Sequence, residues 1–186
     1  MSKTRKMLQL SLLMAVGITL HIFETMLPFL NSFPIPGVKL GLANIVTLLT
    51  LVLWGYREAL LVVLLRSLLS ALLSGTFLTT SFYLSFAGAL GSATAMGGVY
   101  FFARSHLSMV GISICGAVAH NLSQLLVASA LIQQMGIFMY LPYLLLFSLP
   151  TGYFIGLVVI HVLRFLGGIG LAKIRAVIPS PRKIME

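Results

Sequence analysis

Arg66 is the residue whose position in this sequence is hardest to explain by packing alone. It lies about midway along an apolar run at residues 59–73. A charged side chain at the middle of a membrane costs at least ~2.5–3.5 kcal/mol unless it finds a partner. Two interpretations stay open: Arg66 bonds to backbone carbonyls or helix C-termini, or it faces a polar cavity and binds an anionic ligand.

A second polar group lies at about the same depth, in the apolar run 109–132. It consists of His120, Asn121 and Gln124. Residues 120 and 124 share one face of a helix, and residue 121 lies about 100° around from residue 120. Polar groups in lipid need partners, so these side chains should face the interior of a helix bundle. Interhelical hydrogen bonds would satisfy any one of them, but three together, level with an arginine, favour a binding site.

A third group, Lys39, Asn44 and Thr47, begins the run 40–54 in the outer third of the membrane. Lys39 is the only basic residue that the expected topology places outside, so we interpret it as a contact for an anionic group. A pairing of Lys39 with His21 or Glu24 is the alternative. The expected ligand site therefore contains Lys39, Asn44, Thr47, Arg66, His120, Asn121 and Gln124.

The acidic residues exclude much chemistry, because the chain has no aspartate and only three glutamates, Glu24, Glu58 and Glu186. Magnesium-dependent phosphate chemistry needs several carboxylates. No nucleotide-binding glycine loop is present, no histidine pair has metal-ligand spacing, and the single cysteine, Cys115, cannot form a disulfide within the chain. We expect no enzyme activity, no metal and no cofactor.

Six apolar runs must position these side chains in a sequence that is 59% hydrophobic and 8% charged. A membrane-spanning helix needs about 20 mostly apolar residues, and the second and third runs are shorter than that. The sequence therefore predicts an all-α membrane protein with six transmembrane helices, at residues 7–27, 40–54, 59–73, 82–102, 109–132 and 141–165.

The basic residues predict the orientation. If the N-terminus is inside, alternation of sides places ten lysines and arginines inside and only Lys39 outside. This positive-inside bias predicts that both termini are cytoplasmic. We expect a membrane domain at 1–168, a basic cytoplasmic tail at 169–186, and a multi-pass position in a bacterial cell membrane. We interpret the net charge of +9 as topology determinants near anionic lipid rather than as a nucleic-acid surface.

Two runs carry packing signals. The run 82–102 is dense in small residues, which predicts close approach of a neighbouring helix. Pro150, near the middle of the last run, predicts a kink.

Three segments together resemble one known family. They are residues 36–48 (PGVKLGLANIVTL), 66–69 (RSLL) and 119–124 (AHNLSQ). The chain resembles the Gx transporter family, also labelled heptaprenyl diphosphate synthase component I, over about residues 7 to 168. That family is similar to the substrate-binding S-components of energy-coupling factor transporters.

The resemblance implies a six-helix protein that captures a vitamin-like ligand, such as a flavin or an isoprenoid-linked compound. It also implies partners in trans, a membrane T-component and ATPase subunits. S-components often dock through an AxxxA ridge on the first span, and the equivalent here is Ser11, Ala15 and Thr19, which departs from that pattern. The alternatives are a non-catalytic accessory subunit for isoprenoid or quinone synthesis, and a flavin exporter.

Overall fold

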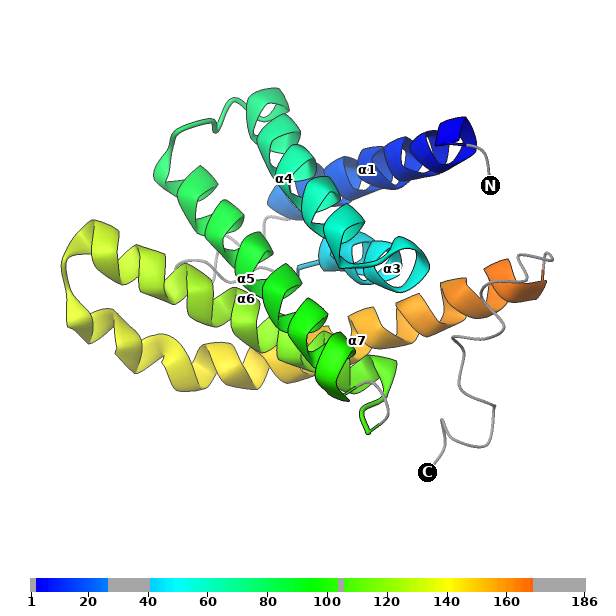
Figure 1. Cartoon of the computed structure of the whole chain (residues 1–186). Coiled ribbons are helices and arrows are strands. Elements are labelled where there is room, and N and C mark those ends of the chain that lie inside the picture. Colours follow the sequence, from blue (N-terminus) through cyan, green and yellow to red (C-terminus); the bar gives the residue numbers. More distant parts are fainter. Residues whose placement is uncertain (1–2, 27–40, 104–105, 169–186) are drawn as a thin grey trace.

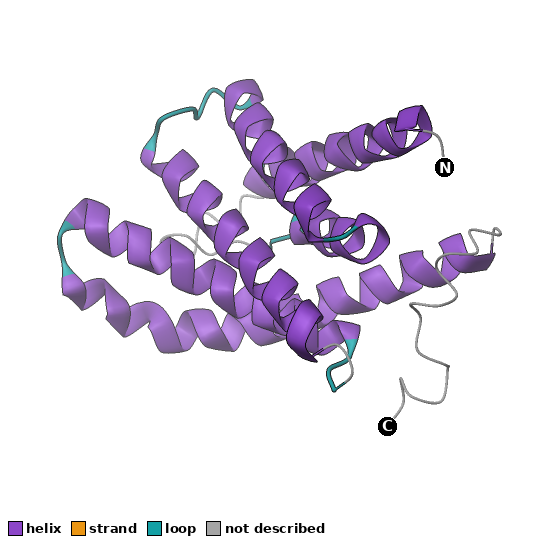
Figure 2. Ribbon diagram, in the orientation of Figure 1, coloured by secondary structure: helices purple, strands orange, loops and turns teal. Residues whose placement is uncertain are grey.

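The computed structural model describes residues 3–26, 41–103 and 106–168, and every regular element in them is a helix. Six are α-helices and one is a short 3₁₀-helix (Figures 1 and 2). Their bounds are α1 Lys3–Thr25, α3 Asn44–Trp54, α4 Tyr56–Leu73, α5 Thr80–Ala103, α6 Met109–Ile132, η1 Met135–Tyr140 and α7 Leu141–Gly168. The expected all-α class is confirmed.

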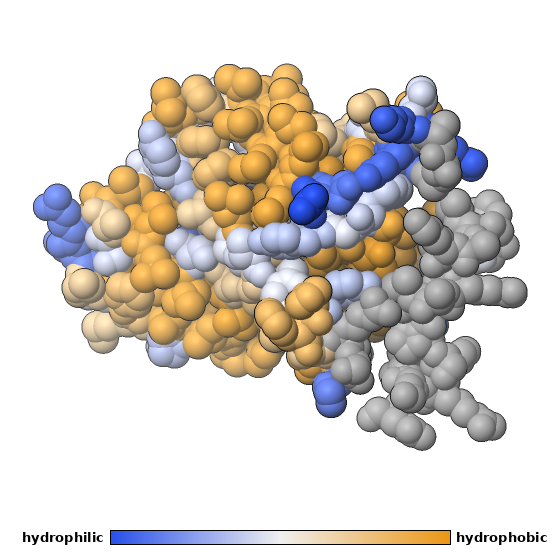
Figure 3. Space-filling view, in the orientation of Figure 1, coloured by the Kyte–Doolittle hydropathy of each residue, from blue (hydrophilic) through white to orange (hydrophobic). Residues whose placement is uncertain are grey.

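Four of these helical segments are long and apolar enough to cross a membrane: α1, α5, α6, and η1 with α7. The helix α3 has 11 residues, which gives it a length of about 16 Å, roughly half the thickness of the hydrocarbon core. The helix α4 has 18 residues and carries Arg57, Glu58 and Arg66. Apolar side chains cover much of the face in Figure 3, as a lipid-facing surface requires. Six complete spans and cytoplasmic termini stay predictions.

The short helix α3 is the most enclosed element. Its residues 44–52 are all buried, and its apolar side chains form the main core with residues of α5, α6 and α7. A helix that is apolar on most sides is buried either in a protein core or in a membrane, and here the residues that bury α3 come from other helices. The short run 40–54 is therefore an internal element of the bundle.

The helices α5, α6 and α7 pack through glycines. A Cβ atom on Gly91 of α5 would lie 1.9 Å from Ser123 Oγ of α6. A Cβ on Gly152 or Gly156 of α7 would lie 2.6 Å from the Cα atom of Ile114 or Val110, respectively, in α6. Glycine is required at these positions because the helix backbones nearly touch. The close packing expected for the run 82–102 is confirmed.

Pro150 lies inside α7, and the helix changes direction near its middle (Figure 1). The proline lacks an N–H for Leu146 O, and the loss of this bond allows the bend.

Contacts between helix ends agree with the expected alternation of sides. Lys6, near the start of α1, pairs with Glu58 at the start of α4. At the opposite ends of the same helices, Thr25 and Ser74 line a common cavity. The membrane orientation predicted from the basic residues places the Lys6 end of α1 in the cytoplasm and the Thr25 end outside.

Candidate functional site

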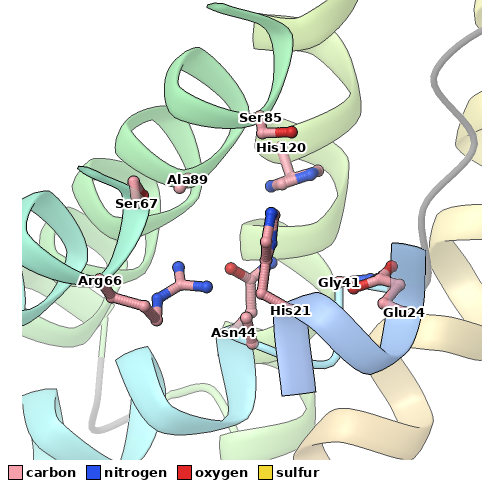
Figure 4. Close-up of a pocket in the computed structure, with 10 residues that line it drawn as sticks. His21, Glu24, Gly41, Asn44, Arg66, Ser67, Ser85, Ala89 and His120 are labelled. Atoms are coloured by element: carbon pink, nitrogen blue, oxygen red, sulfur yellow. The ribbon is translucent and has the colours of Figure 1, made fainter. Parts of the chain in front are cut away.

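A polar cavity lies where α1, α4, α5 and α6 meet the start of α3 (Figure 4). Its lining combines one arginine, one glutamate, two histidines, an asparagine and two serines with small residues. The lining residues are His21, Glu24, Gly41, Ala43, Asn44, Arg66, Ser67, Ser85, Ala89 and His120. These residues come from five separate stretches of the chain, so the cavity exists only in the folded bundle.

Arg66 extends from the middle of α4 into this cavity (Figure 4). Its side chain is 2% exposed, and its Nε atom has no hydrogen-bond partner in the structure. Gly17 of α1 makes room for it, because a Cβ atom at residue 17 would lie 2.6 Å from Arg66 Cδ. The side chain thus crosses from α4 toward α1 and carries its charge into the cavity.

Glu24 is the acidic residue of the cavity and is 4% exposed. The backbone N–H of Gly41 donates a hydrogen bond of 2.6 Å to Glu24 Oε1. Gly41 has a φ of 68°, a left-handed conformation that glycine adopts without strain. The Glu24 carboxylate also attracts Arg66 electrostatically. One buried carboxylate therefore fixes the turn before α3 and offsets part of the arginine's charge.

Two histidines approach each other from opposite walls. Figure 4 shows the imidazole rings of His21 on α1 and His120 on α6 pointing toward one another. His120 is seated against Gly88 of α5, where a Cβ atom would lie 2.8 Å from the ring carbon Cε1. Neutral imidazole has one donor and one acceptor, and imidazolium has two donors. The pair supplies further groups that can hydrogen-bond to an anion.

The cavity is narrow. The space unfilled by atoms measures about 300 Å³, including its open side, but its interior has room for only about one water molecule. A larger ligand must separate the walls. The wall with the fewest buried residues is α1, in which only Gly17 and Glu24 of 23 residues are buried.

The structure brings three of the expected ligand residues together: Asn44, Arg66 and His120 all line the cavity. Lys39 lies outside the described residues. Thr47 and Gln124 are buried at 1% and 4% exposure, but they do not line the cavity. Asn121 Nδ2 donates a hydrogen bond of 3.0 Å to Leu144 O of α7, so its amide joins two helices.

Four polar lining residues were not among the expected ligand residues: His21, Glu24, Ser67 and Ser85. The sequence carried a signal for two of them, because His21 and Glu24 are three residues apart and share a helix face. From sequence, Glu24 did not match Arg66 in depth. The structure places both residues in the lining of one cavity, because the long arginine side chain reaches α1 beside Gly17.

Among the described residues, no group of three or more His, Cys, Asp or Glu side chains is arranged to hold a metal ion. The cavity instead offers a cation, amides and imidazoles as hydrogen-bond donors, with one carboxylate among them. Such a set suits a small organic anion.

The fold and the cavity define a class: a helical membrane protein with a charged polar cavity enclosed by apolar helices. Residues 13–162 match the family described as heptaprenyl diphosphate synthase component I, and the chain belongs to that family. No curated protein and no solved structure matches the chain.

Proposed function

We propose that this protein is a membrane ligand-binding subunit, similar to the S-components of energy-coupling factor transporters, that translocates a small anionic ligand. Candidate ligands are a flavin or an isoprenoid-linked compound. The observation that carries this proposal is Arg66, a charge held in the middle of an apolar bundle and directed into a cavity with Asn44 and His120. A buried charge of this kind is costly unless a partner compensates for it.

Glu24 is the acidic group with which an anionic ligand would compete for Arg66. Its carboxylate attracts Arg66 and remains hydrogen-bonded to Gly41 N. An incoming anion competes with Glu24 for the guanidinium and gains a bidentate partner of the type that carboxylate and phosphate groups prefer. Lys39, which precedes Gly41 by two residues, would add a second positive charge at the cavity mouth.

The helix α1 links the cavity to a partner protein. Gly17, His21 and Glu24 lie on one face of α1, and Ser11, Ala15 and Thr19 lie on a nearly opposite face, at about 100° per residue. The second set is exposed, and Thr19 Oγ1 donates to Ala15 O at 3.0 Å, which turns the hydroxyl back onto its own helix. A small, weakly polar ridge is thus available for a T-component whose ATPases act in trans.

Ligand binding by purified protein tests the proposal. Arg66→Leu should weaken the binding of riboflavin 5′-phosphate or farnesyl diphosphate about tenfold or more, because a hydrogen bond to a charged group contributes roughly 1.5–3 kcal/mol. Arg164→Leu is the matched control, since Arg164 is exposed on α7. Folding should survive in Arg66→Leu, because Glu24 keeps its bond from Gly41 N. Equal affinities for the two variants would refute an anion site at Arg66.

The partner interaction has its own test. Ala15→Leu should keep ligand binding but abolish co-purification of the partner and ATP-driven transport, because one leucine holds two helix backbones apart. Val16→Leu, one exposed position away on α1, should retain both. Full transport by Ala15→Leu, or transport by the chain alone without ATP, would favour a solitary carrier.

A second candidate function follows from the family description. The chain would be a non-catalytic membrane subunit that assists a heptaprenyl diphosphate synthase. The chain contains no aspartate, so a different subunit would have to hold the magnesium diphosphate. Co-purification with a prenyl synthase, together with no binding of any small anion, would support this function over the first.

A further inference from the structure

A second cavity adjoins the first, between the outer halves of α1 and α4, the α4–α5 connection and the start of α5. The unfilled space measures about 350 Å³ including its open side, and its interior, like that of the first cavity, has room for about one water molecule until the walls separate. Its lining residues are His21, Thr25, Ser67, Ala71, Ser74, Thr76, Ser81, Phe82, Ser85 and Phe86. Six of these ten side chains carry a hydroxyl group. Ser67 is buried, whereas Thr25, Ser74 and Ser81 are exposed on the open side of the cavity.

The two cavities share one boundary. His21, Ser67 and Ser85 line both. Arg66 lines only the first cavity, whereas the two phenyl rings and the other four hydroxyl-bearing side chains line only the second. A single elongated ligand can therefore place an anionic group beside Arg66 and an uncharged body among the hydroxyl groups.

The lining of the second cavity indicates what kind of uncharged group the ligand places there. Hydroxyl groups offer both donors and acceptors, and Phe82 and Phe86 add two rings whose centroids lie 5.5 Å apart. A prenyl chain would instead favour a lining of aliphatic side chains, since burying apolar carbon against polar groups strands those groups without partners. Thr25 Oγ1 already donates to Ile22 O at 2.7 Å, which leaves only its acceptor capacity for a ligand.

We propose that the ligand has an anionic group and a hydroxylated or heteroaromatic body, rather than an isoprenoid chain, and that the body occupies the second cavity. This inference rests on the proposed function and narrows its substrate class. The phenyl rings pack against a planar part of the body, and the serine and threonine hydroxyl groups bind its polar edge. The ligand enters from the α4–α5 connection, because Ser74, which caps the end of α4, lines the cavity and is exposed.

Three probes and two variants test the inference on the full chain. The probes are riboflavin 5′-phosphate, farnesyl diphosphate and inorganic pyrophosphate. Ser85→Leu narrows the boundary, and Ser81→Leu fills the second cavity from an exposed position on the first turn of α5. Thr94→Leu, exposed on the same helix and outside both cavities, is the matched control.

Riboflavin 5′-phosphate should bind more tightly than farnesyl diphosphate. Both cavity variants should weaken flavin binding about fivefold or more by steric exclusion. Pyrophosphate affinity should stay unchanged in Ser81→Leu, which lines only the second cavity, and the control should bind every probe normally. Tighter binding of farnesyl diphosphate, or unchanged flavin affinity in folded Ser81→Leu, would overturn this inference but leave the anion site at Arg66 intact. Binding of none of the three probes would overturn the proposed function as well.

Discussion

The two sides of this bundle are held together in different ways. On the side formed by α5, α6 and α7, glycines bring helix backbones into contact: a Cβ at Gly152 or Gly156 would lie 2.6 Å from a backbone atom of α6. On the side formed by α1 and α4, helices meet through long polar side chains, and only Gly17 and Glu24 of α1 are buried.

This difference separates stability from binding. Close backbone packing fixes α6, and with it His120, in a single position. The α1 side leaves space, and the space is where Arg66, Glu24 and His21 meet. We infer that the glycine side is the scaffold and that the α1 side opens for the ligand.

A glycine-to-alanine substitution should lower stability on the α5–α6–α7 side and ligand affinity on the α1–α4 side, and this contrast is the largest expected effect. Gly156→Ala should destabilise the protein by roughly 1–3 kcal/mol, because the new methyl group meets the Val110 backbone and no side-chain movement can relieve the overlap. Gly98→Ala is the control, since nothing lies within 4 Å of its Cβ position. Thermal unfolding in detergent measures both. A Gly156→Ala protein as stable as the control would contradict the scaffold assignment.

Gly17→Ala should behave in the opposite way. Its new methyl group would meet Arg66 Cδ, part of a flexible side chain that can move aside, so the thermal transition should fall little. The displaced guanidinium should nevertheless lower anion affinity by about threefold or more, because charge-assisted hydrogen bonds depend on geometry. Titration with a labelled anion checks this, and a large loss of stability with normal affinity would place Gly17 in the scaffold.

Asn121 and Asn44 extend the comparison of scaffold and site to single polar side chains. Asn121 donates to Leu144 O, so Asn121→Ala should lower stability by about 0.6 kcal/mol, the typical value for such bonds in membranes, without altering affinity. Asn44 lines the cavity, so Asn44→Ala should reduce affinity. If Asn121→Ala instead weakens binding in a fully stable protein, the boundary between scaffold and site is misplaced.

The smallest expected effect is on the ion pair that joins the first turns of α1 and α4, outside the apolar run 59–73. The hydrogen bond from Lys6 lowers the pKa of Glu58 below its usual value. A lowered pKa means that the pair stabilises the folded protein above the unfolded pKa and that this contribution disappears as the pH falls through the folded value. Both groups are partly exposed, so Glu58→Gln should cost less than about 0.5 kcal/mol at neutral pH, and this cost should shrink as the pH falls through the lowered pKa of Glu58.

The helices could be predicted from the sequence because long apolar runs have few alternatives in lipid. The run 109–132 coincides with α6, and the run 82–102 differs from α5 by one or two residues at each end. The enclosed position of α3 was not predicted, because a short apolar run has the same composition inside a bundle as in lipid.

The site was only partly predictable, for a geometric reason. Periodicity assigns a residue to a face of its own helix, but it does not say which helix that face meets. Asn121 and His120 are adjacent in sequence, yet one bonds to α7 and the other lines the cavity. Glu24 belongs to the site because α1 packs beside α4 and α5, an arrangement that periodicity does not reveal.

Anion affinity measured in Glu24→Gln and Arg66→Leu tests the central claim most directly. Glutamine keeps an acceptor for Gly41 N but removes the charge that competes for Arg66, so Glu24→Gln should bind a labelled anion about threefold more tightly or better. Arg66→Leu should bind it about tenfold more weakly. Opposite shifts in two folded variants are the predicted result. Shifts in the same direction, or none, would contradict an anion site formed by Arg66 and guarded by Glu24.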